Sequence, residues 1–99
     1  MRYIIKYSYQ AINDRKNLFN FITFDCGSPI TALQYLQEIK DTIKQLEVFP
    51  EIYAIRTNKS LFRYGENIRL ITYKKIAIIY TIRKNIVYIQ RIIAASLIQ

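Results

Sequence analysis

The chain has 99 residues, a net charge of +8, no histidine and one cysteine, Cys26. This length allows one domain with one core over residues 1–99, and the 52% hydrophobic content with two glycines indicates a folded protein rather than a disordered one. The missing histidines exclude a Ser-His-Asp triad, a Cys-His pair and histidine-based metal ligation, and a single thiol excludes an internal disulfide.

The first half of the chain predicts a strand followed by two helices. Residues 2–7 are short and rich in Tyr and Ile, which is typical of a strand. Ser8 is placed to cap a first helix, which ends at residues 24–27. A Ser-Pro pair at residues 28–29 opens a second helix with an apolar stripe, and Pro50 ends it. A connection of about three residues predicts that the helices pack as an antiparallel hairpin.

Beyond Pro50 the apolar period changes from helical to extended. We expect an irregular loop over residues 51–60, a short strand over residues 61–64 and a turn after it. Short charged turns favour antiparallel pairing of three further strands, which are predicted over residues 68–73, 76–82 and 86–93.

The predicted strand over residues 76–82 is apolar on both faces, because Ile78 and Tyr80 alternate with Ala77 and Ile79. An antiparallel sheet with one face in water normally alternates apolar and polar residues. Two helices can cover one face only. We therefore infer that a partner chain or a second copy of the protein covers the other face.

The net charge belongs to the second half of the chain. Residues 52–99 contain nine Lys and Arg residues but one acid, Glu66, whereas residues 1–51 contain six residues of each sign. A field this one-sided attracts a polyanion or an acidic protein. Residues 1–6 lack the apolar stretch of a signal peptide, and no apolar run reaches the ~20 residues that a membrane-spanning helix needs. We expect a cytoplasmic protein that does not enter a membrane.

The order and spacing of these segments resemble the RelE/ParE superfamily of bacterial toxins. The resemblance runs through nearly the whole chain and is carried, among other segments, by Ser28-Pro29-x-x-Ala32-x-x-Tyr35, Leu46-x-x-Phe49-Pro50-Glu51, Ile68-Arg69-Leu70-Ile71-x-Tyr73 and Val87-Tyr88-Ile89-x-Arg91-Ile92. It implies an α+β fold, β-α-α-β-β-β, in which the helical hairpin packs on a twisted antiparallel sheet. It also implies a growth-arresting, plasmid-stabilising toxin of a type II toxin–antitoxin system. A small acidic antitoxin would wrap the toxin and neutralise it. The assembly would be a dimer or a heterotetramer of toxin and antitoxin.

Members of this superfamily act in two ways: some cut mRNA on the ribosome, and others poison DNA gyrase. The RNA-cutting members hold the scissile phosphate with basic residues of the sheet and need no metal or cofactor. Many of them end in a His-x-x-Arg-like pair, and these positions are Ala94 and Leu97 here. Because residues 94–99 have no ionisable side chain, the chain is closer to the gyrase-directed branch or to an inactive relative, and an enzymatic activity stays open. The alternative is a small, basic, non-toxic nucleic-acid-binding module.

Arg69 is the leading candidate for a catalytic side chain. It matches the arginine that opens the central strand in RNA-cutting members, where a guanidinium can stabilise charge that develops on the phosphate. The other interpretation is an arginine that pairs with Glu66 or is solvated. Further candidates for contact with nucleic acid or another target are cations and tyrosines suited to phosphates and bases, namely Arg56, Lys59, Arg63, Tyr73, Tyr80 and Arg91. A solvated loop is the commoner role for such cations and sheet packing for such tyrosines. Asp14 is interpreted as a helix-surface residue.

Overall fold

The computed structural model of the protein describes residues 2–98. The helices and strands follow the predicted α+β order, as β1 (Ile4–Tyr7), α1 (Tyr9–Cys26), α2 (Pro29–Lys44), β2 (Arg69–Tyr73), β3 (Ile76–Arg83) and β4 (Ile86–Ala94). Short 3-10 helices occupy Gln45–Glu47, Pro50–Ile52, Lys59–Tyr64 and Ala95–Leu97. Over residues 2–98, the helices are too short or too polar to cross a membrane.

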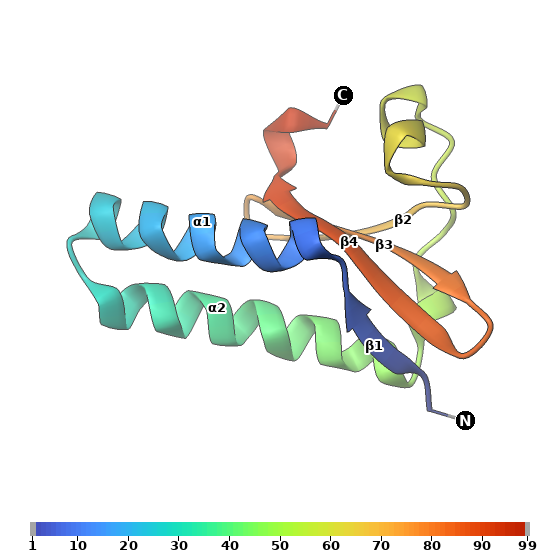
Figure 1. Ribbon diagram of the computed structural model, residues 1–99, viewed down its shortest axis with the longest axis horizontal. Helices are drawn as coiled ribbons and strands as arrows, with labels where there is room; N and C mark the ends of the chain where they lie inside the picture. Colours follow the sequence, from blue (N-terminus) through green and yellow to red (C-terminus); the bar gives the residue numbers. More distant parts are fainter. Residues whose placement is uncertain (1, 99) are drawn as a thin grey trace.

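The helix bounds follow from local sequence signals. Ser8 Oγ accepts a hydrogen bond from the Ala11 N–H at 2.9 Å, and Ser28 Oγ accepts one from the Thr31 N–H at 3.2 Å. Each serine therefore satisfies a donor that the first turn of its helix leaves unpaired. Gly27 has a φ of 65° and ends α1 in the left-handed conformation that glycine adopts easily. The connection is so short that α1 and α2 lie antiparallel, as predicted (Figure 1).

The strands form one four-stranded sheet in the order β1-β4-β3-β2 (Figure 1). The pairs β2–β3 and β3–β4 are antiparallel, as the short turns predicted. In contrast, β1 pairs with β4 in parallel, with Ile4 opposite Ile86 and Tyr7 opposite Ile89. Parallel pairing needs a long crossover connection, and the chain between β1 and β4 contains the helical hairpin. The sheet is therefore mixed, and not antiparallel throughout.

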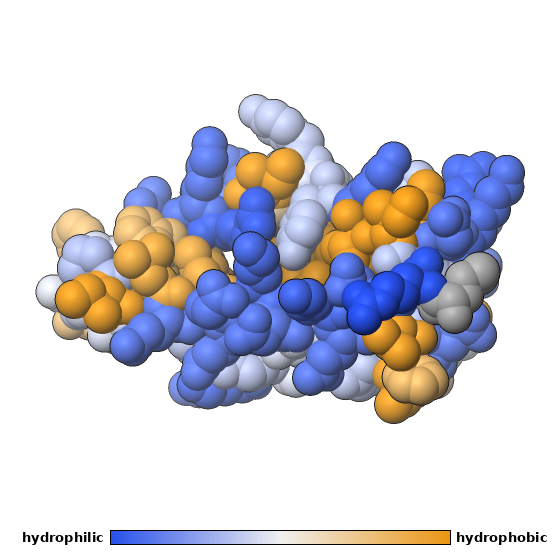
Figure 2. Space-filling view, turned by 90° about the horizontal axis from the view of Figure 1, so that it is seen from below, coloured by the Kyte–Doolittle hydropathy of each residue, from blue (hydrophilic) through white to orange (hydrophobic). Residues whose placement is uncertain are grey.

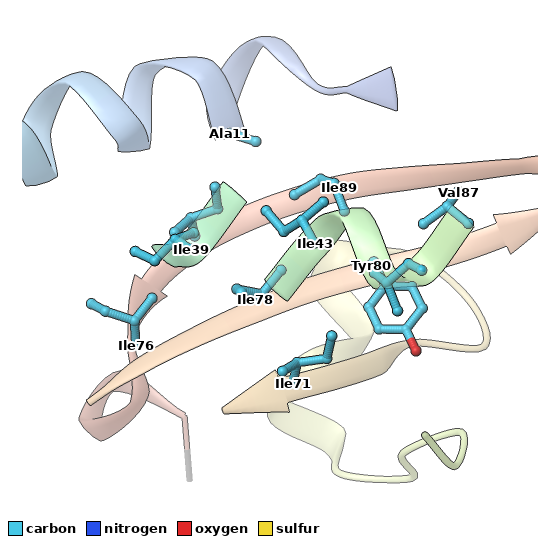
Figure 3. Packing of buried hydrophobic residues seen from close by; sticks show 11 residues of the cluster. Ala11, Ile39, Ile43, Ile71, Ile76, Ile78, Tyr80, Val87 and Ile89 are labelled. Atoms are coloured by element: carbon cyan, nitrogen blue, oxygen red, sulfur yellow. The ribbon is translucent and has the colours of Figure 1, made fainter. Parts of the chain in front are cut away.

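The helical hairpin covers one face of the sheet. Figure 3 shows Ile39 and Ile43 of α2 beside Ile78 of β3, in the middle of the main core. Each fully buried side chain of this kind stabilises the fold by about 1.5–3 kcal/mol relative to exposure. The buried members of this core are Ala11, Ile39, Ile43, Leu46, Ile71, Ile76, Ile78, Tyr80, Val87, Ile89 and Ile92.

The other face of the sheet is covered by the chain itself. The 3-10 helix Lys59–Tyr64 places Leu61 in a second cluster with Ile68, Ile79 and Ile93. Ile79 is fully buried as a result, so the inference that a partner must cover this face of β3 was wrong. The strand predicted over residues 61–64 was also wrong. Leu61 and Tyr64 are three residues apart, a spacing that puts both side chains on one side of a 3-10 helix.

Candidate functional site

Arg69 lies on the face of the sheet that carries the helices, since it pairs with Tyr80 across β2 and β3. Its Nη1 donates hydrogen bonds to the carbonyl oxygens of Tyr53 at 2.6 Å and Glu51 at 3.2 Å. The guanidinium therefore holds the segment that follows α2 against the start of β2. Its partners in the fold are main-chain oxygens, and not Glu66 as considered from the sequence.

Tyr80 is buried next to this segment. Its hydroxyl donates a hydrogen bond to the Pro50 carbonyl oxygen at 2.6 Å. Burial raises the pKa of Tyr80 to about 12, although the charge of Arg69 acts in the opposite direction. The side chain is fully buried, so Tyr80 packs the core and cannot reach a nucleic acid or a target in this conformation.

Tyr73 also faces the helices. Its hydroxyl donates a hydrogen bond to Glu38 Oε1 on α2 at 2.7 Å, and its ring meets the Tyr35 ring edge-on with centroids 5.9 Å apart. This hydrogen bond raises the pKa of Tyr73 and lowers the pKa of Glu38. Lys74 Nζ lies 3.4 Å from the same carboxylate. The predicted site residue Tyr73 therefore ties the turn between β2 and β3 to α2.

Arg91 is anchored to α1. Its Nε and Nη2 donate hydrogen bonds to the Asp14 carboxylate at 2.8 and 3.1 Å, and these bonds raise the pKa of Arg91. The same carboxylate accepts the Ile92 N–H at 3.0 Å. Residues 90–94 extend past the end of β1 in the pairing register, so Asp14 satisfies a strand N–H that β1 does not reach. Asp14 is thus a buried anchor, and its interpretation as a helix-surface residue was wrong.

The sheet face opposite the helices gathers cations around one tyrosine. The guanidinium carbons of Arg63 and Arg91 lie 5.1 and 5.8 Å from the centroid of the Tyr64 ring, within range of a cation–π attraction. Arg63 also lines a shallow hollow of ≈ 320 Å³ with Lys59 and Leu97. We call Lys59, Arg63 and Arg91, with Tyr64, the basic face.

A polar groove of ≈ 640 Å³ is lined by Arg83, Tyr88 and Gln90 together with the turn after Tyr64. Arg83 and Tyr88 are not among the site residues predicted from the sequence, although a charged turn and a strand tyrosine suit contacts to phosphates and bases. Their position follows from the strand register, because Tyr88 pairs with Thr81 and Arg83 with Ile86, whereas Tyr80 and Ile82 pack against the main core. Successive side chains of a strand point to opposite faces of the sheet. The sequence of β3 could therefore have placed Thr81 and Arg83 on the face away from the helices.

The predicted site residues are divided between two faces. The structure brings Lys59, Arg63 and Arg91 to one face and places Arg69 on the other, with Tyr73 and Tyr80. The Arg56 N–H donates a hydrogen bond to the Ile68 carbonyl oxygen at 2.7 Å, and its side chain is exposed. Arg69 therefore does not share a surface with Lys59 and Arg63.

A second groove, which the sequence did not predict, runs between α1 and α2. It has a volume of ≈ 530 Å³, and its lining is mainly apolar, from Ile12 and Phe19 of α1 to Leu33 and Leu36 of α2. Three cations also line it, namely Arg15, Lys16 and Lys40. We call it the hairpin groove. Apolar residues at helical spacing on the outer side of both helices were its signal in the sequence.

Two of three comparisons with known proteins found a match. The family model described as the ParE toxin of the type II toxin–antitoxin system parDE matches residues 5–96. A chain from a solved structure of the chromosomal ParDE toxin–antitoxin system of P. aeruginosa is similar in fold, with a TM-score of 0.78 and 19% sequence identity, over 94% of this chain and 96% of that chain. None of the curated protein sequences compared with this chain matches it.

Proposed function

The chain belongs to the ParE toxin family of type II toxin–antitoxin systems, and we propose that it arrests growth by binding DNA gyrase rather than by cutting mRNA. The observation that carries this proposal is the position of Arg69. Its guanidinium binds the carbonyl oxygens of Tyr53 and Glu51 and lies on the opposite sheet face from Arg63 and Arg91. Arg69, which the sequence favours for phosphate chemistry, therefore has a structural role and does not belong to the basic face.

The end of the described chain supports the same proposal. Ala94 and Leu97 stand where RNA-cutting relatives carry ionisable residues, and they belong to β4 and the 3-10 helix that follows it. Neither side chain can transfer a proton. A toxin that works by binding needs no such group, because a complementary surface is sufficient.

The basic face is the surface that we assign to the target. Arg63 and Lys59 are exposed, and Arg91 and Tyr64 are partly exposed. Cations next to an aromatic ring suit an acidic protein surface as well as a polyanion, and they speed association by long-range attraction. The same chemistry fits RNA, so cleavage of mRNA is the competing outcome that an experiment must exclude.

We assign the hairpin groove to a small acidic antitoxin. An amphipathic helix binds in an apolar groove through residues repeated along one side. Arg15, Lys16 and Lys40 at the groove would attract acidic residues that flank this apolar stripe. Loss of binding on charge reversal at Lys40, with unchanged toxicity, would support the assignment.

Induced expression in a bacterial host tests the function. We expect growth arrest with filamentation, broken DNA and intact mRNA. The variant Arg69→Lys keeps a cationic donor for the Tyr53 carbonyl oxygen but lacks the planar guanidinium, and it should stay toxic. Arrest with cut mRNA that Arg69→Lys abolishes would contradict the gyrase proposal. Normal growth would indicate an inactive relative or a non-toxic nucleic-acid-binding protein.

Charge reversal tests whether the basic face binds the target. Arg63→Glu should weaken toxicity because it changes the sign of the basic face. Lys75→Glu is the matched control, since Lys75 is also exposed but lies in the turn between β2 and β3. Equal toxicity of both variants would show that the target binds elsewhere.

A further inference from the structure

The outer end of the helical hairpin is apolar and almost uncharged. From residue 17 to residue 37 the sequence contains one charged residue, Asp25, although the chain as a whole carries +8. Four large apolar side chains of this stretch are exposed: Phe21 by 67%, Phe24 by 93%, Ile30 by 68% and Leu33 by 58%. We call these four residues the hairpin end. Figure 2 shows hydrophobic surface over the hairpin, at the left, as well as further hydrophobic patches at the right.

The core does not explain these side chains. The hairpin extends beyond the sheet, so its outer turns have no strand to pack against (Figure 1). Beyond residue 16, α1 buries Ile22 but leaves Phe21 and Phe24 in water. Of these four residues only Leu33 lines the hairpin groove, so the groove that we assign to an antitoxin leaves Phe21, Phe24 and Ile30 uncovered.

The exposed area is large enough for a weak interface. Taking about 200 Å² for each fully exposed large side chain, the four residues present on the order of 500 Å². Two such surfaces would bury on the order of 1,000 Å² together, which is at the small end of specific interfaces. An exposed apolar patch of this size is within the range found on monomers, where the largest patch is often functional.

The charge distribution indicates what binds there. The basic face belongs to the sheet and not to the outer turns of the hairpin, in a molecule that measures 40 Å along its longest axis (Figure 1). The cation that comes nearest from the sheet is Lys74, which reaches Glu38 in the middle of α2. Two copies with a net charge of +8 repel each other, but screening at physiological salt acts over ~8–10 Å. Contact through the hairpin ends joins two surfaces that carry one acid each, Asp25, and no cation, and it keeps the basic faces of the two copies apart. An acidic protein or a nucleic acid would find no cation at this end.

We propose that the hairpin end binds a second copy of this chain, in a symmetric, end-to-end dimer. In such a dimer Phe21 and Phe24 of one copy meet the apolar residues of its partner across a two-fold axis. The basic face stays open at both distal ends. Both basic faces of the dimer are thus free to bind a target, because neither takes part in the contact between the two copies.

Sedimentation equilibrium of the purified full-length chain tests the proposal. We expect a dimer with a micromolar dissociation constant that changes little between low and high salt, because each copy contributes mainly apolar side chains and a single charge, Asp25, to the interface. Phe24→Ser should raise this constant by about tenfold or more, since an exposed aromatic anchor contributes most to a small interface. Phe62→Ser is the matched control. Phe62 is 61% exposed in the 3-10 helix Lys59–Tyr64, far from the hairpin end, and its loss should leave the constant unchanged.

A cross-link provides a second, independent readout. Cys26 is exposed at the end of α1, within the same end of the hairpin. A short bis-maleimide should join two wild-type chains through Cys26 and should fail with Phe24→Ser. The proposal is overturned by a wild-type chain that stays monomeric at hundreds of micromolar, or by equal weakening in Phe24→Ser and Phe62→Ser. It is also overturned if a maleimide reacts freely with Cys26 in the isolated chain and fails to react only when an acidic antitoxin is added, because the antitoxin then covers this end.

Discussion

The sheet and the outer part of the helical hairpin differ in both packing and charge. In β3, five consecutive residues from Ile76 to Tyr80 are buried, because helices cover one face and the 3-10 helix Lys59–Tyr64 covers the other. In the hairpin beyond residue 16, large apolar side chains such as Phe24 are exposed. The basic face lies on the packed part and the hairpin end on the unpacked part, although Phe49 and Ile52, beyond the end of α2, are also 69% and 73% exposed. Two different kinds of partner are therefore favoured at the two ends of the molecule.

An identical substitution at the two ends gives the largest contrast. Ile78→Ala removes a fully buried side chain from the centre of β3 and should lower the free energy of unfolding by about 2–5 kcal/mol, because it leaves a cavity. Ile30→Ala removes a side chain that is mostly in water and should change the free energy by less than about 0.5 kcal/mol. Urea unfolding of dilute protein measures both. Similar losses would mean that the hairpin end is part of the core.

The anchor between α1 and β4 gives the next effect. Asp14→Ala leaves the Arg91 guanidinium and the Ile92 N–H without their acceptor, and should cost about 2–3 kcal/mol. Asp25→Ala is the control on the same helix. Asp25 is exposed in the last turn of α1, where a negative charge opposes the helix dipole, so its removal should be neutral or slightly stabilising. Equal unfolding curves for both variants would refute the role of Asp14.

A smaller effect is expected at Tyr80. Tyr80→Phe deletes the donor to the Pro50 carbonyl oxygen and should cost about 1–2 kcal/mol at neutral pH. Tyr9→Phe, at a hydroxyl on an 87% exposed residue, is the control and should cost almost nothing. The measurement is again the unfolding free energy.

The difference in unfolding free energy between the wild type and Tyr80→Phe should depend on pH. Burial raises the pKa of Tyr80 to about 12, from an ordinary value of 10.0. The folded state therefore disfavours the phenolate, and the stability due to the neutral hydroxyl is complete below pH 10 and is lost as the pH rises toward 12. The wild type should lose more stability than Tyr80→Phe between pH 9 and pH 11. A constant difference over this range would show that Tyr80 is not buried as described.

The hairpin was predictable from the sequence because its signals are local. Ser8 and Ser28 bond to N–H groups three residues away, and Gly27 acts through its own backbone. The parallel pairing of β1 and the role of Asp14 were not predictable in the same way. Asp14 meets Ile92 across 78 residues of chain, and no periodicity encodes such a contact.

The candidate site was also predicted only in part, because it too depends on contacts between distant parts of the chain. The sequence placed Arg69 at the start of a strand but could not say which face it occupies, because the face depends on register against Tyr80. Arg63 and Arg91 were named among the candidates, but the ring of Tyr64 that joins them was not. Their proximity depends on the 3-10 helix that the sequence analysis took for a strand.

We propose that this toxin binds DNA gyrase and uses no catalytic group of its own. The most direct measurement is a supercoiling assay with purified DNA gyrase, plasmid DNA and the purified chain. We predict that the wild type and Arg69→Lys inhibit supercoiling equally and that linear plasmid accumulates. Unchanged gyrase activity at saturating concentrations of the chain would contradict the proposal that it binds gyrase.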